Sequence, residues 1–325
     1  MAADNNLSED AYDDIEEMKK GFSETGVNLV VFMDTQDELP CILKITSYSA
    51  ETIHTYGEFN SANPVQMHRT LNDIVSMYPS ESYGLVLWSH GTSWLPADRQ
   101  LKSFGNDNGA QMNIPDLADA LPVKFDFILF DACLMGSVEV AYELRNNADF
   151  IIASSTETIY TGFPYDEIVP ELLKPSINLQ SVVRKYFDYY DGLEGAYRSA
   201  SVSLIDTREL ENLASLTAEL ISGNEMDENF DRTKVQRLDV YKEQYTFDFA
   251  DFIAKAFPSA NRDAFMAQLN KTVLYRAHTP AFLDEYQIET YCGLACYIPL
   301  PGRADLNAYY QSLQWYREVI LNFEF

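Results

Sequence analysis

Two stretches of the sequence decide the fold. The first reads Tyr83-Gly84-Leu85-Val86-Leu87-Trp88 and runs into Ser89-His90-Gly91, and the second extends from Phe125 to Phe130 and runs into Asp131-Ala132-Cys133. Short apolar runs of this kind are typical of strands that are buried on both faces. A turn that contains glycine follows each run, so both stretches are predicted to be strands that end just before chemically reactive residues.

Strands and helices alternate on either side of these two stretches. The pattern predicts further strands at Val27–Met33, Ile42–Thr46 and Phe150–Ala153, and helices at residues 65–78, 114–121 and 138–144. Alternation of this kind, with runs that are apolar on both faces, indicates a parallel sheet covered by helices on both sides. The predicted fold class is therefore α/β, with a mostly parallel central sheet between two helical layers.

The second half of the chain is predicted to be more helical. Helices are expected at residues 179–190, 208–221, 247–257, 262–274 and 307–321, with strands at Ala200–Ile205 and Gly293–Ile298. The polar and acidic residues 223–231 are the best candidate for a boundary between two parts of the chain. We therefore expect an α/β domain at residues 1–222 and a mostly helical part at residues 223–325, which returns a late strand (residues 291–299) to the same core.

The composition limits the class of protein. The chain has 325 residues, of which 46% are hydrophobic, and this is enough apolar material for a sizeable core. The formal net charge of −27 opposes binding to nucleic acid or to anionic lipid. No apolar run approaches the roughly 20 residues that span a bilayer. We expect no signal peptide in this chain and no disulfide framework from its 4 Cys.

His90 and Cys133 are the residues at which chemistry is expected. In open α/β sheets ligands bind beyond the carboxyl ends of the strands, and each of these residues follows such an end. A Cys before a helix start gains thiolate character from the helix dipole, and an imidazole favours thiolate further and protonates a leaving amine. The order, with His before Cys, is that of the caspases. Taken singly, each residue is more often structural than catalytic.

Other motifs fail or are absent. The segment Gly91-Thr92-Ser93-Trp94-Leu95 begins like the nucleophile elbow of serine hydrolases but lacks its second glycine. The sequence has no glycine-rich phosphate loop, no His-Glu-x-x-His and no Cys-x-x-Cys, and we expect Cys292 and Cys296 to lie in the core. Six of the nine residues from Glu9 to Glu17 are acidic. A solvated helix face is expected there, with a cation site as the alternative; no metal site is assigned.

The two strand-end motifs resemble the active-site motifs of clostripain-like cysteine peptidases. They are Leu87-Trp88-Ser89-His90-Gly91 and Phe130-Asp131-Ala132-Cys133-Leu134-Met135-Gly136. Supporting similarities lie at Ala3–Leu7, Ala153–Tyr165 and Gly293–Pro299, so the resemblance extends along most of the chain. It implies a caspase-like three-layer sandwich, with residues 1–222 as the catalytic domain, and an endopeptidase that cleaves after Arg or Lys.

The resemblance also implies roles for individual residues. Cys133 is the nucleophile, and His90 is the general acid/base. Asp131 is the carboxylate that meets the basic side chain of the substrate; the alternative is a turn residue at a strand end. A carboxylate in a narrow cleft discriminates because a neutral substrate leaves it unpaired.

Further residues complete the expected site. Thr158 and Thr161 lie in the loop that follows the next strand, where they could form the wall of the substrate pocket. The backbone groups of Gly91 and Cys133 are the candidates for the oxyanion site.

The polar loop from Thr92 to Gln111 is the candidate for proteolytic processing of a zymogen. The resemblance implies cleavage at a basic residue between His90 and Cys133, and the loop contains Arg99 and Lys102. Exposed loops are where nicking concentrates. An ordinary surface loop that is never cut is the alternative.

The resemblance implies properties of the whole protein as well. Members are typically exported from bacteria, to the periplasm, to a lipid anchor or out of the cell. The sequence itself indicates no cofactor. Calcium is a candidate cofactor only because of the family resemblance. Expected partners are proteins or peptides with exposed Arg or Lys, and neither nucleic acid nor a membrane-spanning segment is expected. The family's first strand precedes the turn at Ala3, so a sheet edge is expected to be one strand short here.

Two other functions stay open. One is a cysteine hydrolase of the same fold with a different specificity, in which Asp131 is structural. The other is a catalytically silent binding module that keeps the fold.

Overall fold

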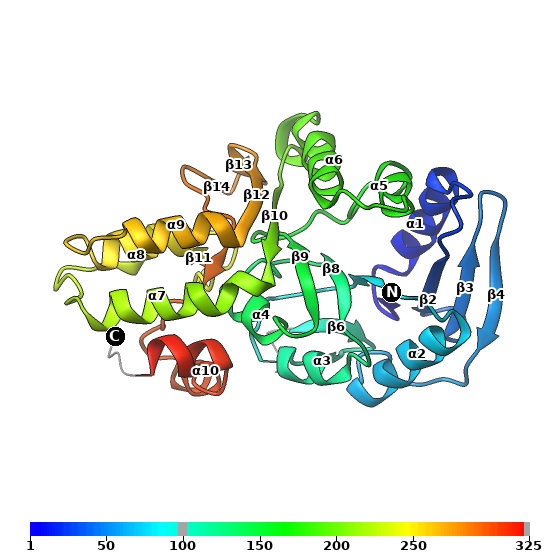
Figure 1. Ribbon diagram of the computed structural model, residues 1–325, viewed down its shortest axis with the longest axis horizontal. Coiled ribbons are helices and arrows are strands. Elements are labelled where there is room, and N and C mark those ends of the chain that lie inside the picture. The colour runs from blue at the N-terminus through cyan, green and yellow to red at the C-terminus, as the bar shows by residue number, and fades with distance from the viewer. Residues whose placement is uncertain (97–102, 322–325) are drawn as a thin grey trace.

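A five-stranded sheet forms the centre of the molecule in the computed structural model, which describes residues 1–96 and 103–321 (Figure 1). Its strand order is β12-β10-β9-β8-β5. The strands are β5 (Gly84–Trp88), β8 (Phe125–Asp131), β9 (Ala148–Ala153), β10 (Ser201–Asp206) and β12 (Val273–His278). β5, β8 and β9 run parallel, whereas β10 and β12 are each antiparallel to their neighbours. The predicted parallel sheet thus corresponds to β5, β8 and β9 only.

Helices cover both faces of this sheet, because the side chains of β8 alternate between two apolar clusters. Ile128 and Phe130 join the cluster with α3, α4 and α7, and Phe127 and Leu129 join the cluster with α1, α5 and α6. The helices are α1 (Ser8–Gly21), α3 (Ile114–Ala120), α4 (Val138–Glu143), α5 (Tyr165–Leu172), α6 (Leu179–Asp191) and α7 (Leu210–Ser222). The predicted three-layer sandwich is confirmed. α5 was not predicted, because Gly162 and Pro164 indicated a turn.

A second sheet corrects the prediction for the N-terminal strands. β2 (Leu29–Thr35), β3 (Cys41–Ile45) and β4 (Ala50–Thr55) form an antiparallel meander, and β1 (Ala2–Ala3) pairs parallel with β2. The predicted strands at Val27–Met33 and Ile42–Thr46 therefore exist but do not belong to the parallel sheet. Their short connection permits a hairpin, and a parallel pair would need a longer crossover. β4 was not predicted. α2 (Pro64–Met77) then leads to β5.

A groove separates the free edges of β2 and β5. It has a volume of about 960 Å³, and residues 27–32 and 84–88 line its two sides. β1 lies at one end of the groove, where the Ser89 hydroxyl donates to the Ala2 carbonyl (2.6 Å) and the Met1 amine donates to the Phe32 carbonyl (2.8 Å). The groove therefore continues the line of β1 between the two sheets, at the edge where the family resemblance implies a further strand.

The C-terminal part packs into the same core as the α/β part. It comprises β11 (Phe247–Asp248), α8 (Phe249–Ala256), α9 (Asp263–Thr272), β13 (Ala281–Phe282), β14 (Tyr286–Gln287), β15 (Ala295–Cys296), α10 (Ala304–Tyr310) and a π-helix (Tyr316–Ile320). The predicted late strand pairs with β11 rather than with the central sheet. Most apolar side chains of this segment, including Leu294 and Cys296, join the cluster of α4.

Several hydrogen bonds fix this part to α4 and to the turn before it. The Ala295 N–H donates to the Gly136 carbonyl (2.8 Å), and the Tyr297 N–H donates to Glu139 Oε1 (2.8 Å). The Gln314 side-chain amide donates to Glu143 Oε2 (2.8 Å).

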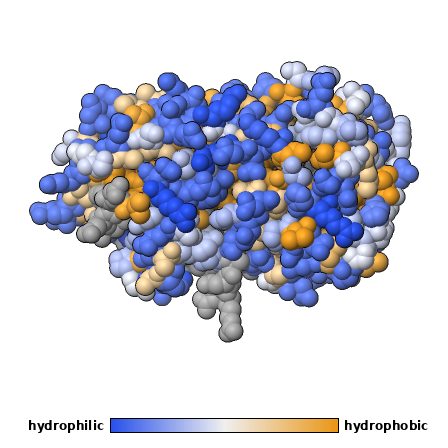
Figure 2. Space-filling view, turned by 60° about the horizontal axis from the view of Figure 1, so that its bottom comes forward, coloured by the Kyte–Doolittle hydropathy of each residue, from blue (hydrophilic) through white to orange (hydrophobic). Residues whose placement is uncertain are grey.

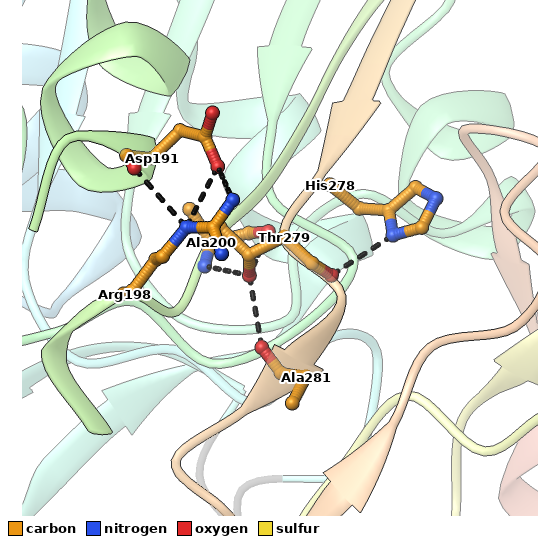
Figure 3. Close-up of polar contacts among 6 residues, drawn as sticks. All are labelled: Asp191, Arg198, Ala200, His278, Thr279 and Ala281. Carbon is orange, nitrogen blue, oxygen red and sulfur yellow. Dashed lines mark hydrogen bonds and ion pairs between the residues drawn. The ribbon is translucent and has the colours of Figure 1, made fainter. Parts of the chain in front are cut away.

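A network of polar contacts continues the pairing of β12 with β10 beyond the ends of the two strands (Figure 3). The Thr279 N–H donates to the Ala200 carbonyl (2.9 Å), and the Thr279 hydroxyl donates to the Ala281 carbonyl (2.9 Å). His278 Nδ1 contacts the Thr279 carbonyl (2.9 Å), so this histidine belongs to the edge of the sheet. Arg198 binds the Asp191 carboxylate beside the network (2.6 Å).

The surface is consistent with the high net charge. Figure 2 shows a mostly hydrophilic face on which apolar side chains gather in separate small groups. Among the described residues, no helix combines the length and the apolar character that a membrane span requires.

Glu139 provides a test of the joint between the two parts of the chain. Its side chain is fully buried, and burial raises its pKa from 4.5 to about 7. Its stabilising contribution is therefore complete below pH 4.5 and is lost as the pH rises through about 7. Glu139→Gln keeps an acceptor for Tyr297 but does not titrate. Relative to the wild type, its free energy of unfolding in urea should rise by about 3 kcal/mol between pH 4 and 8.

The control for this measurement is Glu211→Gln, which changes an exposed carboxylate on α7. It should follow the wild-type pH profile. If the free energies of unfolding of Glu139→Gln and the wild type changed equally with pH, Glu139 would not titrate in the folded state as proposed.

Candidate active site

The parallel pairing of β5 with β8 brings the two strand-end motifs together. Trp88 pairs with Asp131, and the Ser89 N–H donates to the Asp131 carbonyl (3.3 Å). Each β8 residue stands 43 positions after its β5 partner, which is also the separation between His90 and Cys133. His90 and Cys133 therefore each stand two residues after the paired positions Trp88 and Asp131, at the same level beyond adjacent strands. Gly91 is in close contact with the second motif, because a Cβ at this position would lie 2.8 Å from the Cys133 carbonyl.

His90 is oriented by the N-terminal turn. Its Nε2 lies 2.9 Å from Asn6 Oδ1. With that oxygen as the acceptor, Nε2 carries the proton and Nδ1 is the basic nitrogen. Asn5 holds the turn in place, since its side-chain amide donates to the carbonyls of Ala2 (3.0 Å) and Asn106 (2.6 Å). Sequence reasoning missed the role of Asn6, although it marked the turn as a similarity to the family.

The Cys133 thiol is held between two backbone groups of Thr158. The Thr158 N–H donates to Sγ (3.2 Å), and Sγ lies 3.6 Å from the Thr158 carbonyl. Burial raises the pKa of the thiol to about 12, although the Thr158 N–H acts in the opposite direction. In this state Cys133 is therefore a protonated thiol, not a thiolate.

The expected contribution of a helix dipole to Cys133 is wrong. α4 begins at Val138, five positions after Cys133, and it has only six residues. Leu134 adopts a left-handed conformation (φ 65°), so the chain turns sharply after Cys133 instead of entering a helix. A helix dipole therefore does not favour the thiolate form of Cys133.

The candidate oxyanion groups lie on the two turns that follow β5 and β8. Within the described part of the chain, the Gly91 N–H is the donor of no backbone hydrogen bond. Its contact with the Cys133 carbonyl places it directly beside the second candidate.

Asp131 is the last residue of β8, two positions before Cys133. It is 5% exposed, and its Oδ2 accepts from the Phe163 N–H (3.1 Å) and the Tyr165 hydroxyl (2.9 Å). Burial raises its pKa to about 6, so it is ionised at neutral pH. Both bonds end on Oδ2, and within the described residues Oδ1 has no hydrogen-bond partner. Gly162 packs against the carboxylate with φ 59°, and a Cβ there would lie 2.6 Å from Oδ2.

The acidic helix α1 contributes to this region instead of forming only a solvated face. Asp14 is buried and accepts from Trp88 Nε1 (2.7 Å), and burial together with the charge of Asp131 raises its pKa to about 9. Glu17 accepts from the Tyr165 N–H (3.0 Å). Asp14 is therefore neutral at pH 7, and the negative charge stays on Asp131. Sequence periodicity alone cannot identify such inward-facing carboxylates.

The loop after β9 places the two predicted threonines differently. The backbone of Thr158 brackets the thiol, whereas the Thr161 hydroxyl contacts the Tyr190 hydroxyl (2.8 Å) and thereby supports the loop around Asp131. Arg99 and Lys102 lie outside the described residues.

Among the described residues, no three His, Cys, Asp or Glu side chains are arranged to hold a metal ion.

Comparisons with known proteins agree with this arrangement. A family model described as the clostripain family matches residues 1–296. Clostripain of Hathewaya histolytica is 29% identical over 212 residues, which are 51% of this chain and 40% of clostripain, so the match leaves more than half of that relative uncovered.

Two solved structures are similar over nearly the whole chain. One is an inactive zymogen C11 protease from Parabacteroides distasonis, with 31% identity and a TM-score of 0.86 over 98% of this chain and 95% of that chain. The other is a secreted C11 cysteine protease from Bacteroides thetaiotaomicron in complex with an irreversible peptide inhibitor. It is 29% identical, with a TM-score of 0.86 over 99% of this chain and 97% of that chain. The chain therefore belongs to the clostripain family of C11 cysteine proteases.

Proposed function

We propose that this cysteine protease is an endopeptidase that cleaves after Arg or Lys, with Cys133 and His90 as its catalytic dyad. The observation that carries the proposal is the register of β5 against β8, which sets the two residues at one level beyond the sheet. A relative described as an inactive zymogen and another described as a complex with an irreversible peptide inhibitor support a peptidase that is made as a zymogen and binds peptides.

The reaction follows from these groups. His90 takes the thiol proton, and the Cys133 sulfur attacks the substrate carbonyl carbon, whose oxygen is stabilised by the N–H groups of Gly91 and Cys133. The C–N bond breaks as His90 gives its proton to the leaving amine. A water molecule, deprotonated by His90, then attacks the thioester, and the acid product leaves with the thiol restored.

Asp131 would supply the preference for a basic residue. Its Oδ2 accepts from the Phe163 N–H and the Tyr165 hydroxyl, which leaves Oδ1 for a charge-assisted contact with a Lys or Arg side chain. If the protein is instead a cysteine hydrolase with a different specificity, Asp131 serves only as a structural acceptor for Phe163 and Tyr165. If it is a silent binding module, His90 and Cys133 have no catalytic role.

The setting of the protein is part of the same proposal. A relative described as secreted favours export from a bacterial cell, and the substrates would be proteins or peptides with accessible Arg or Lys. The reaction as written uses only groups of this chain and requires no cofactor; calcium is an expectation of the family resemblance alone.

Removal of either member of the dyad should abolish turnover. Cys133→Ala and His90→Ala should each lower kcat/KM for an Arg or Lys peptide by about 10³-fold or more. Fluorogenic peptides measure the rate, and circular dichroism confirms that each variant is folded. Substantial turnover by a folded Cys133→Ala would contradict the proposed nucleophile.

Asp131 should set the selectivity. Asp131→Asn should reduce the ratio of kcat/KM for a Lys peptide to that for its norleucine analogue by about 10- to 100-fold. In the wild type this ratio should fall as the pH drops below about 6, because the carboxylate becomes protonated. In Asp131→Asn the ratio should not depend on pH in this range. An unchanged ratio in the variant would place the selectivity elsewhere.

Processing in the loop between the dyad residues should depend on the enzyme's own activity. Incubation of the wild type and Cys133→Ala side by side, followed by sequencing of new amino termini, should show cleavage after Arg99 or Lys102 in the wild type only. Full activity from a chain that stays intact throughout would show that the loop is an ordinary surface loop.

A further inference from the structure

Glu157 lies in the short segment that supports the nucleophile. The Leu134 N–H donates to the Thr156 carbonyl (2.8 Å), and both backbone groups of Thr158 contact Cys133 Sγ. Glu157 stands between these two points. Any movement of its backbone therefore changes the position of the thiol.

The Glu157 side chain connects this segment to the C-terminal part. Its Oε1 accepts from the Val240 N–H (2.9 Å), while its Oε2 is buried and has no hydrogen-bond partner among the described residues. Buried carboxylate oxygens are usually satisfied, because leaving one unpaired costs stability. This contact, made by a side chain that is only half satisfied, joins the nucleophile segment to residues far along the chain. It acts beside the hydrogen bonds that tie residues 154–156 to Ser201 and Ser155 to Tyr291.

The loop of residues 239–246, on the other side of this contact, is rigid. The fully buried Asp239 accepts from the N–H groups of Tyr241 (2.9 Å), Tyr245 (2.7 Å) and Thr246 (2.6 Å), and Arg237 binds the Asp239 carbonyl (2.7 Å). Val240 therefore projects its N–H from a loop whose shape is fixed by its own hydrogen bonds. Such a loop can act as an anchor for Glu157.

We propose that Glu157 is a positioning residue for the nucleophile, which pins the segment around Cys133 to the loop of residues 239–246 through the Val240 N–H. The contact holds the Thr158 backbone against the thiol and limits access to it. Substrate turnover needs this alignment, whereas a small alkylating reagent needs only access to sulfur. The two rates should therefore respond in opposite directions when the contact is broken.

The charges around this contact predict a second effect. Burial and the nearby Asp239 raise the pKa of Glu157 to about 7, and Arg237 acts in the opposite direction. The charges of Glu157 and Asp131 both raise the pKa of Cys133. Ionised Glu157 therefore opposes thiolate formation. Removal of its charge alone should shift the thiol titration to lower pH.

Three variants separate the contact from the charge. Glu157→Ala removes both, Glu157→Gln keeps an acceptor and removes the charge, and Val240→Pro removes the donor and leaves Glu157 unchanged. Glu211→Ala, at an exposed carboxylate on α7, is the matched control. Cys133→Ala gives the background from the other cysteines.

The measurements are the rate of iodoacetamide alkylation as a function of pH and kcat/KM for a Lys peptide. Glu157→Ala and Val240→Pro should raise the alkylation rate at pH 8 by about fivefold or more and lower kcat/KM by about tenfold or more. Glu157→Gln should retain most of its turnover and show an alkylation midpoint at lower pH. The control should match the wild type in both assays.

Equal losses of both rates, or no change in either, would overturn the proposal, since a merely structural residue would behave in this way. If Glu157→Ala does not fold, Val240→Pro provides the same test. The turnover measurement rests on the proposed peptidase function. The alkylation measurement does not, so a failure of the positioning role and a failure of the peptidase assignment are distinguishable.

Discussion

The parallel pairing of β5 with β8 is the constraint on which the active site depends. Paired residues are 43 positions apart along the whole ladder, and His90 and Cys133 have the same separation. A slip of one residue would set the two at different levels and would turn the side chains of β8 to the wrong apolar cluster. Burial of both faces of β8 prevents such a slip, since Ile128 and Leu129 point into different clusters. The core of the protein thus fixes the geometry of its chemistry.

Burial also determines the charge state of the site. Asp14 is held neutral at physiological pH, while Asp131, which accepts two hydrogen bonds, stays ionised. The Cys133 side chain is half-buried, and desolvation raises the pKa of its thiol to about 12, so the thiol is protonated. A single negative charge in a buried position is well suited to attract a cationic side chain, because the low dielectric strengthens the interaction.

The sequence allowed the strand ends to be predicted, because short apolar runs and the polar residues that follow them are local signals. Pairing direction is not local. The apolar run of β2 resembles a parallel strand but forms a meander with β3. The contact of Asn6 with His90 joins residues 84 positions apart, and the contact of Glu157 with Val240 joins residues 83 apart. Such contacts follow from the complete fold, so they could not be derived from spacing or composition.

An irreversible peptide label tests the central claim that Cys133, His90 and Asp131 form one site. The label carries lysine before an electrophilic ketone, and its adduct is located by mass spectrometry of the digested protein. We expect one adduct per chain, on Cys133, at a rate that falls strongly in His90→Ala and when norleucine replaces lysine. An adduct on another cysteine, or equal rates for the lysine and norleucine labels, would contradict the claim.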